Sequence, residues 1–157
     1  MHAPDRRPAV SSALSYCDPK GALRWLEQAF GLEPYMVILD ADSNLAHSEM
    51  RFGDGVVMIG SEWSENHRSP ASLQGKNTQT VHLHLSPEMG EIDAHCARAR
   101  QAGARILREP ETQFYGDRVY SAVDPEGHIW TFGQTVKAMT SEEWDKASGL
   151  KTLSRLP

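Results

Sequence analysis

The sequence predicts an α+β fold in which a strand–helix–three-strand module occurs twice within a single domain of 157 residues. The repeat is expected over about residues 11–61 and about residues 79–135. In both segments a proline stands near the start of a helical pattern, a glycine follows its end, and a turn signal precedes the last strand. Two half-sheets of this kind can enclose a cavity for a small ligand.

The first module is expected to begin with a strand over residues 11–17. Asp18 can cap the helix that follows, and Pro19 stands at its first position, where a missing N–H costs least. Apolar residues recur at helical spacing up to Gly31, which supplies the left-handed residue that ends the helix. Three further strands are expected at residues 35–39, 46–52 and 56–59, and the polar stretch 63–77 should be a loop between the modules.

The second module begins with a strict alternation of apolar and polar residues over 81–85, which predicts a strand with at least one buried face. A helix should follow, with Cys96 on its apolar stripe, and end at Gly103. Cys96 is therefore expected to be a buried thiol. Three short strands are expected near residues 105–107, 118–123 and 128–134.

A separate helix is expected over about residues 141–147 at the C-terminal end. Thr140 and Glu143 have the spacing of a capping box, and Met139 and Trp144 can form a hydrophobic staple across it. This helix is a candidate for covering exposed strand edges in a homodimer.

Composition argues against two classes of partner. The net charge of −5 and the isoelectric point near 5.8 do not fit a nucleic-acid-binding protein, which needs a basic face. No apolar stretch approaches the roughly 20 residues of a membrane span, and the N-terminus lacks a signal-peptide core. Residues 1–10 are expected to form a loose arm, and a cytoplasmic location fits best.

Four segments together are similar to a known family: Asp18–Gly31, Val81–Gly103, Gln113–Arg118, and the hairpin Asp124–Trp130 with its Asp-Pro-Glu-Gly-His sequence. The chain resembles the vicinal oxygen chelate superfamily, which includes glyoxalase I, bleomycin-resistance proteins and extradiol dioxygenases. The resemblance is closest to the glyoxalase-like branch, whose members often have no assigned activity. It implies paired βαβββ modules that curl into an incomplete barrel, usually within a dimer.

The resemblance also implies up to four metal-ligand positions on the first and last strands of the modules. The resemblance places these positions at Ser11, Ile59, His82 and Thr131, of which Ile59 and Thr131 follow from matching Gly55 to Gly127 and counting four residues onward. Metal-dependent members carry His, Glu or Gln at most of them, and here only His82 is such a residue. One imidazole and one or two hydroxyls make a poor set of donors for a divalent cation, so neither a metal nor another cofactor is expected.

His82 and His84 are the candidate catalytic residues. They lie two apart in a strand and so share a face, opposite Val81, Leu83 and Leu85, which should pack against the helices. Both imidazoles should then point into the cavity, where they could bind a metal, transfer protons or orient an anion. The alternative is that they only line a polar interior.

Candidate ligand-binding residues come from three other places. His47 and Glu49 share a strand face and could join His82 in a metal or acid–base cluster, or could lie on an exposed sheet face. Trp63, an aromatic residue in a polar loop, could form the cavity mouth or a dimer edge, whereas Trp130 should be core. Thr131 occupies a cavity-facing family position.

Tyr115 and Arg118 are a candidate ligand clamp, because a phenol can form a hydrogen bond and a guanidinium can bind a carboxylate or phosphate. The alternative is a structural turn in which Arg118 pairs with Asp117. As a clamp with the two histidines, these residues would favour a planar or aromatic ligand that carries an oxyanion.

The sequence therefore predicts a small-molecule-binding protein without the usual metal site of the superfamily. It could sequester a toxic compound, or it could catalyse a metal-independent isomerase or lyase step with His82 or His84 as base. The alternative is a metal-dependent lyase or dioxygenase that uses His82 with partners such as His47 and Glu49. Whether the protein is an enzyme stays open, because a fold does not fix a function.

Overall fold

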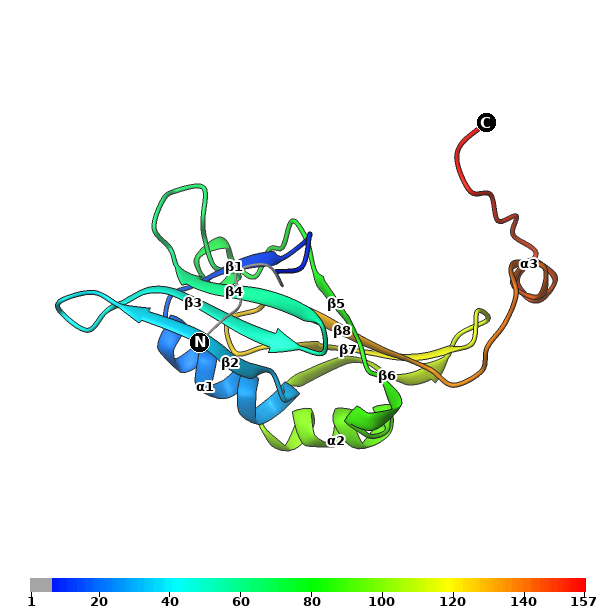
Figure 1. Cartoon of the computed structure of the whole chain (residues 1–157), viewed down its shortest axis with the longest axis horizontal. Helices are drawn as coiled ribbons and strands as arrows, with labels where there is room; N and C mark the ends of the chain where they lie inside the picture. The colour runs from blue at the N-terminus through cyan, green and yellow to red at the C-terminus, as the bar shows by residue number, and fades with distance from the viewer. Residues whose placement is uncertain (1–6) are drawn as a thin grey trace.

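The computed structural model describes residues 7–157, and in this range the strands form two four-stranded sheets (Figure 1). The expected α+β architecture of two βαβββ modules and a C-terminal helix is confirmed. The strand order is β1-β4-β3-β2 in one sheet and β5-β8-β7-β6 in the other, and the two sheets do not close into a barrel. Residues 1–6 of the expected N-terminal arm lie outside the described residues.

The first module has the predicted caps on its helix. The Asp18 carboxylate accepts a hydrogen bond from the Gly21 N–H at 3.0 Å, and Gly31 ends the helix with a φ of 74°. Within the sheet, the first strand runs parallel to the fourth. The elements are β1 (Ser12–Tyr16), α1 (Pro19–Phe30), β2 (Glu33–Leu39), β3 (Leu45–Phe52) and β4 (Gly55–Ser61).

The second module repeats this topology, with β5 parallel to β8. The strand β6 (Arg105–Thr112) is longer than the three residues, 105–107, predicted from the sequence. One short 3₁₀ turn precedes β5 and another follows it. One of them lies in the stretch expected to be only a loop. The elements are η1 (Pro70–Leu73), β5 (Val81–His84), η2 (Pro87–Met89), α2 (Ile92–Gln101), β6 (Arg105–Thr112), β7 (Asp117–Val123) and β8 (Ile129–Thr135).

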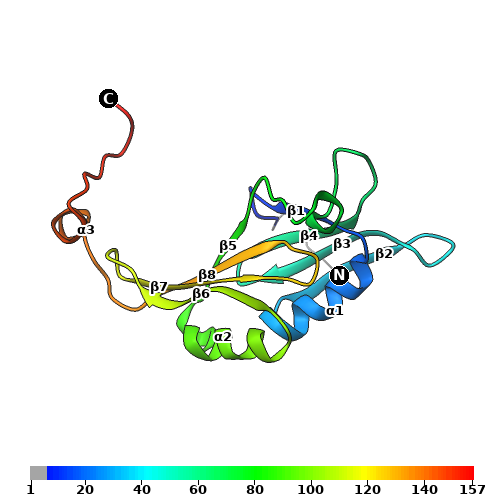
Figure 2. The same ribbon diagram turned by 180° about the vertical axis from the view of Figure 1, so that it is seen from behind.

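One hydrophobic core joins the two modules. In both views α1 and α2 lie side by side on the same side of the two sheets (Figures 1 and 2). Phe30 of α1 packs against Trp130 and Phe132 of β8, with ring centroids 5.5 and 4.7 Å apart. Trp130 and Cys96 are buried as expected, at 0% and 1% exposure. Burying each such aromatic side chain contributes on the order of 1.5–3 kcal/mol, so the shared core stabilises both modules together.

The face of the sheets opposite α1 and α2 is called the helix-free face below. Val81 and Leu85 are buried and Leu83 packs against the core, while the side chains of His82 and His84 are exposed. The alternation predicted for this strand is therefore confirmed, and both histidines lie on the helix-free face.

The last helix, α3 (Ser141–Ser148), lies beyond the far end of β7 and β8, away from α1 and α2 (Figures 1 and 2). Its capping box is formed: the Thr140 hydroxyl accepts from the Glu143 N–H, and the Glu143 carboxylate accepts from the Thr140 N–H. Among the described residues, no helix combines the length and the apolar character that crossing a membrane would require.

Candidate functional site

A row of polar side chains crosses the helix-free face of the second module. His82 on β5 lies opposite Thr131 on β8, and Thr131 lies opposite Ser121 on β7. The two hydroxyls share a hydrogen bond of 2.8 Å. A side chain at Gly133 would begin only 3.3 Å from the His82 Nε2, so the glycine leaves room for this imidazole. The row presents one exposed imidazole beside two hydroxyls, a set suited to hydrogen bonding with a ligand.

His84 stands at the edge of a large cavity. Its Nδ1 lies 4.0 Å from the Asp117 carboxylate and its Nε2 lies 3.4 Å from the Thr135 hydroxyl. Asp117 and Thr135 also line a cavity of about 610 Å³ between the β6–β7 loop and α3, together with Tyr115 and Trp144. The structure thus places His84 next to Asp117 and Thr135, which line the same cavity as Tyr115.

Sequence reasoning missed Asp117 and Thr135, although a signal was present. Residues of a strand alternate between its faces, so Asp117 shares a face with Ser121, and Thr135 shares a face with Thr131. Extending the alternation of β7 and β8 to their outer ends would have found both residues.

The corresponding row in the first module centres on Glu49. On the helix-free face this residue lies between Met36 of β2 and Met58 of β4. Its side chain is 1% exposed. The Oε1 atom accepts hydrogen bonds from Arg7 at 2.8 Å and from His47 at 3.1 Å. The Oε2 atom is buried and has no hydrogen-bond partner in residues 7–157.

The Glu49 carboxyl is held in its charged form. Burial works to raise its pKa, but the hydrogen bonds from His47 and Arg7 outweigh burial and lower the pKa below its ordinary value. Glu49 is therefore a buried carboxylate with one oxygen satisfied and one oxygen without a donor.

The cluster of His47, Glu49 and His82 considered from sequence is not formed. Within residues 7–157, no group of three or more His, Cys, Asp or Glu side chains is placed to hold a metal ion. His47 and Glu49 lie together on β3, whereas His82 belongs to the row of the second module.

Two of the family positions assigned from the sequence are wrong, Ile59 by counting and Ser11 by the resemblance. Ile59 is fully buried in the core, where it pairs with Leu14, and Ser11 precedes β1. The pair that corresponds to His82 and Thr131 on the helix-free face is Ala13 and Met58. Counting from the glycines failed because the two hairpins differ in length: residues 53–54 join β3 to β4, but residues 124–128 join β7 to β8.

Arg118 does not lie with the histidines. Successive residues of β7 point to opposite faces, so Arg118 points to the helix side while Asp117 lies near His84. The guanidinium binds both carboxylate oxygens of Asp93 on α2, at 2.7 and 3.2 Å. Neither the ligand clamp with Tyr115 nor the alternative pairing with Asp117 is formed, and the argument for an oxyanion-bearing ligand loses its charge partner.

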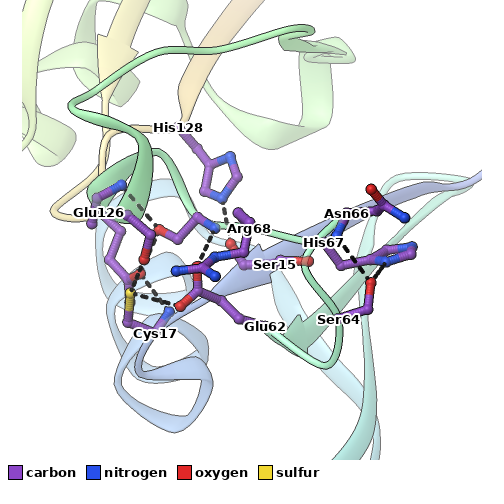
Figure 3. A network of polar contacts seen from close by, with 12 residues as sticks. Ser15, Cys17, Glu62, Ser64, Asn66, His67, Arg68, Glu126 and His128 are labelled. Carbon is purple, nitrogen blue, oxygen red and sulfur yellow. Dashed lines mark hydrogen bonds and ion pairs between the residues drawn. The ribbon is translucent and has the colours of Figure 1, made fainter.

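Trp63 lies in the loop after β4 rather than on a strand of either sheet. Its ring is 72% exposed and stacks on His67 with centroids 3.9 Å apart. Glu62 holds this loop, because its carboxylate accepts from the Ser69 N–H at 2.8 Å and from the Arg68 guanidinium at 3.0 Å (Figure 3). Hydrogen bonds from the Ser69 backbone and the Ser72 side chain lower the pKa of Glu62 to about 2.

Glu126 extends the network to the second module. It accepts hydrogen bonds from the Cys17 N–H at 2.6 Å and from the Ser69 hydroxyl at 2.7 Å (Figure 3). Nearby, His128 Nε2 donates to the carbonyl of Ser15 at 2.8 Å. The loop after β4 is therefore hydrogen-bonded to both modules, and the exposed indole of Trp63 stacks on His67 within it.

Comparisons with known proteins agree on one family. A model of the Glyoxalase/Bleomycin resistance protein/Dioxygenase superfamily matches residues 10–132. An uncharacterized protein of Mycobacterium bovis is 30% identical over 140 residues, which is 87% of this chain and 89% of that protein.

Two solved structures illustrate the shared fold. TioX from Micromonospora sp. ML1 has a TM-score of 0.63 and 27% identity over 82% of this chain and 98% of TioX. TnmS3, an antibiotic binding protein from Streptomyces sp. CB03234, has a TM-score of 0.60 and 16% identity over 82% of this chain and 99% of TnmS3.

Proposed function

Because this chain belongs to the Glyoxalase/Bleomycin resistance protein/Dioxygenase superfamily, we propose that it binds a small organic molecule on the helix-free face and acts by sequestering it. The observation that carries this proposal is the polar row on the helix-free face, in which the exposed His82 lies beside the partly buried Thr131 and the buried Ser121. The antibiotic-binding function of the structurally similar TnmS3 supports the same class of ligand.

We assign different roles to the polar groups in this proposal. His82 and Thr131 would form hydrogen bonds with the ligand on the sheet, and Tyr115 would contact it from the adjoining cavity. Trp63 would offer an exposed aromatic surface at the rim. On the first module, His47 would donate a hydrogen bond to the buried carboxylate of Glu49.

The residues at the family's metal positions do not fit a divalent cation. Ala13 has no donor atom, the Met58 thioether is a weak ligand for the cations these sites usually hold, and the Thr131 hydroxyl is bonded to Ser121. His82 remains as the one strong donor of this set. A metal-dependent lyase or dioxygenase step therefore has no support from these side chains, and we propose binding without a metal.

One observation favours a second candidate, a metal-independent isomerase or lyase step. The Asp117 carboxylate lies 4.0 Å from His84 Nδ1, at the edge of the cavity that contains Tyr115. A carboxylate in this position can orient an imidazole that acts as a general base. Turnover of a bound compound that is lost in His84→Ala but not in His47→Ala would favour this candidate over sequestration.

We further propose a homodimer in the cytoplasm. Strand β2 lies at an edge of its sheet and exposes Val37, Ile38 and Leu39, each about half exposed. Such an apolar edge favours pairing or covering by another chain. Light scattering should give about twice the chain mass of 17.5 kDa at micromolar concentration, and a value near 17.5 kDa would reject the dimer.

A thermal-shift screen tests the main proposal. The compounds should be aromatic, with anionic, neutral and cationic members and several planar antibiotics, and each should be measured with and without a chelator. A ligand at 100 times its Kd adds about 2.7 kcal/mol of stability, so binding raises the melting temperature. We expect hits that survive chelation and weaken in His82→Ala. Absence of any hit, or hits that require added metal, would contradict the proposal.

A further inference from the structure

We propose that Glu49 binds the positively charged group of the ligand, and that the Arg7 guanidinium occupies this group's place when no ligand is bound. The inference rests on the proposed small-molecule function and specifies the class of compound. Ligands of this class carry an amidinium, guanidinium or primary ammonium group on an aromatic or otherwise apolar body.

The first support is the unequal bonding of the two carboxylate oxygens. Oε1 accepts from both Arg7 and His47, whereas Oε2 is buried and accepts from no side chain or backbone group in the described part of the chain. A buried acceptor without a donor is costly, more so when it is charged. An amidinium or guanidinium presents parallel N–H donors that match both oxygens of a carboxylate, and an ammonium has three donors to share between them.

The second support is the surface around the carboxylate. Met36 and Met58 are the cross-strand neighbours of Glu49 on either side, and both are partly buried. Methionine side chains are flexible and polarisable, and their sulfur atoms make favourable contacts with aromatic rings. A carboxylate between two thioethers thus fits a cation that is attached to an apolar or aromatic body.

The third support is the way in which Arg7 reaches Glu49. Arg7 lies outside the sheet, ahead of β1, and its side chain is 53% exposed even though it bonds a carboxylate that is only 1% exposed. A half-exposed arginine in a segment before the first strand can leave without disturbing the core. Its bond at 2.8 Å shows that a guanidinium fits at this carboxylate.

The other charged side chains near the proposed site also favour a cationic ligand over an anionic one. The cation expected to select an anionic ligand, Arg118, is held by Asp93 on the helix side of β7. On the helix-free face Asp117 contributes a second carboxylate, next to His84. With a net charge of −5 for the chain, the surface favours the approach of cations over anions.

NMR titration of the ¹⁵N-labelled full chain with benzamidine and with benzamide, its neutral counterpart, tests the inference. We expect benzamidine to shift the amides of His47 and Glu49 and to bind roughly fivefold or more tightly than benzamide, because its charge-assisted bonds need the carboxylate. Glu49→Gln keeps the side-chain shape and should remove the preference. Arg7→Ala removes one of the two donors to Oε1, leaving His47, and should tighten benzamidine binding about threefold.

The controls separate this inference from the general function. Glu88→Gln removes an exposed acid on η2 and should leave the preference for benzamidine unchanged. Equal binding of the two compounds, an unaltered preference in Glu49→Gln, or weaker benzamidine binding in Arg7→Ala would overturn the role of Glu49. In those cases the proposed function would still stand if compounds in the thermal-shift screen bind regardless of charge. If no compound of any charge binds, the proposed function fails as well.

Discussion

Asp124 stabilises the junction between the modules through its buried carboxylate. Oδ2 accepts from the Tyr16 hydroxyl at 2.7 Å and from the Trp130 indole at 3.1 Å, and Oδ1 accepts from the backbone N–H groups of Glu126 and His128 at 3.0 Å. Tyr16 belongs to β1, so this one side chain links the first strand of one module to the last hairpin of the other. Burial and the nearby Asp124 charge raise the pKa of Tyr16 well above its ordinary value, so Tyr16 stays a donor.

Replacing Asp124 should therefore lower the free energy of unfolding far more than replacing an exposed acidic residue. Asp124→Ala leaves buried donors without an acceptor, and we expect the free energy of unfolding to fall by about 3 kcal/mol or more. Asp42→Ala, in the exposed turn after β2, should change it by less than about 0.5 kcal/mol. Urea denaturation of both variants makes the comparison, and a loss below 1 kcal/mol for Asp124→Ala would refute the role given to this carboxylate.

His95 makes a second buried connection, from α2 to the end of α1. Its Nε2 faces the carbonyl of Phe30 at 2.7 Å, and a carbonyl can only accept, so Nε2 must carry the proton. Its Nδ1 then accepts from the Tyr120 hydroxyl at 2.6 Å. Burial lowers the pKa of His95, and the nearby Arg98 charge acts in the same direction.

We predict that folded His95, as the Nε2–H tautomer, takes up a proton only at a lower pH than the same ring in the unfolded chain. In the unfolded chain the same ring should titrate near its usual pKa of about 6.5. Because the unfolded state then binds more protons, stability from this group is present above that value and is lost as the pH falls. Long-range ¹H–¹⁵N spectra measure the ring directly, with a sample in concentrated urea as the reference. A folded ring that protonates at the same pH as the ring in urea, or at a higher pH, would contradict the prediction.

Among the elements, the loop between β4 and β5 should make a contribution to stability that depends on pH. Glu62 holds it through the Ser69 N–H, and the pKa of Glu62 falls to about 2 as a result. A carboxyl with a lowered folded-state pKa stabilises the fold above its unfolded pKa, and this contribution is lost as the pH falls from about 5 toward 2.

Glu62→Gln should remove this dependence. The stability difference between wild type and Glu62→Gln should be largest above pH 5 and should shrink steadily as the pH approaches 2. Urea midpoints at several pH values measure this difference, with Glu65→Gln, an exposed acid of the same loop, as the matched control. A difference that does not change with pH would show that the charge of Glu62 is not involved.

The helices and strands could be predicted from the sequence because the residue patterns that indicate them are local. Asp18 and Gly31 delimit α1, Thr140 with Glu143 starts α3, and alternation around His82 orients β5. Each signal involves residues a few positions apart, and no distant contact has to be known.

The parts of the site that were missed or misplaced depend on contacts between distant segments. Arg118 is held by Asp93, and Glu49 is held by Arg7. No sequence pattern links the members of either pair. The error at Ile59 is of another kind, because it arose from assuming equal hairpins in the two modules. Cross-strand register, which fixes which residues face each other, depends on turn geometry as well as on the hydrophobic pattern.

At the level of the whole molecule, the two modules form one body around a shared core. Arg98 of α2 donates to the carbonyls of Glu27 and Gln28 at the end of α1, at 2.9 and 2.8 Å, and the Gln28 carbonyl is one of the groups that a helix end leaves unpaired. With α1 and α2 packed together on one side, the polar rows of both modules are left on the other. Binding on the helix-free face is the function that this arrangement supports.

Mapping a bound compound with ¹³C-methyl methionine spectra tests this claim most directly. Met36 and Met58 lie on the helix-free face, Met50 is fully buried on the opposite face of β3, and Met139 lines the cavity beside α3. When the strongest hit of the thermal-shift screen is titrated into the protein, we predict saturable shifts of Met36 and Met58 and little change at Met50. Shifts confined to Met139, or no shifts at Met36 and Met58 while the compound binds, would contradict binding on the helix-free face.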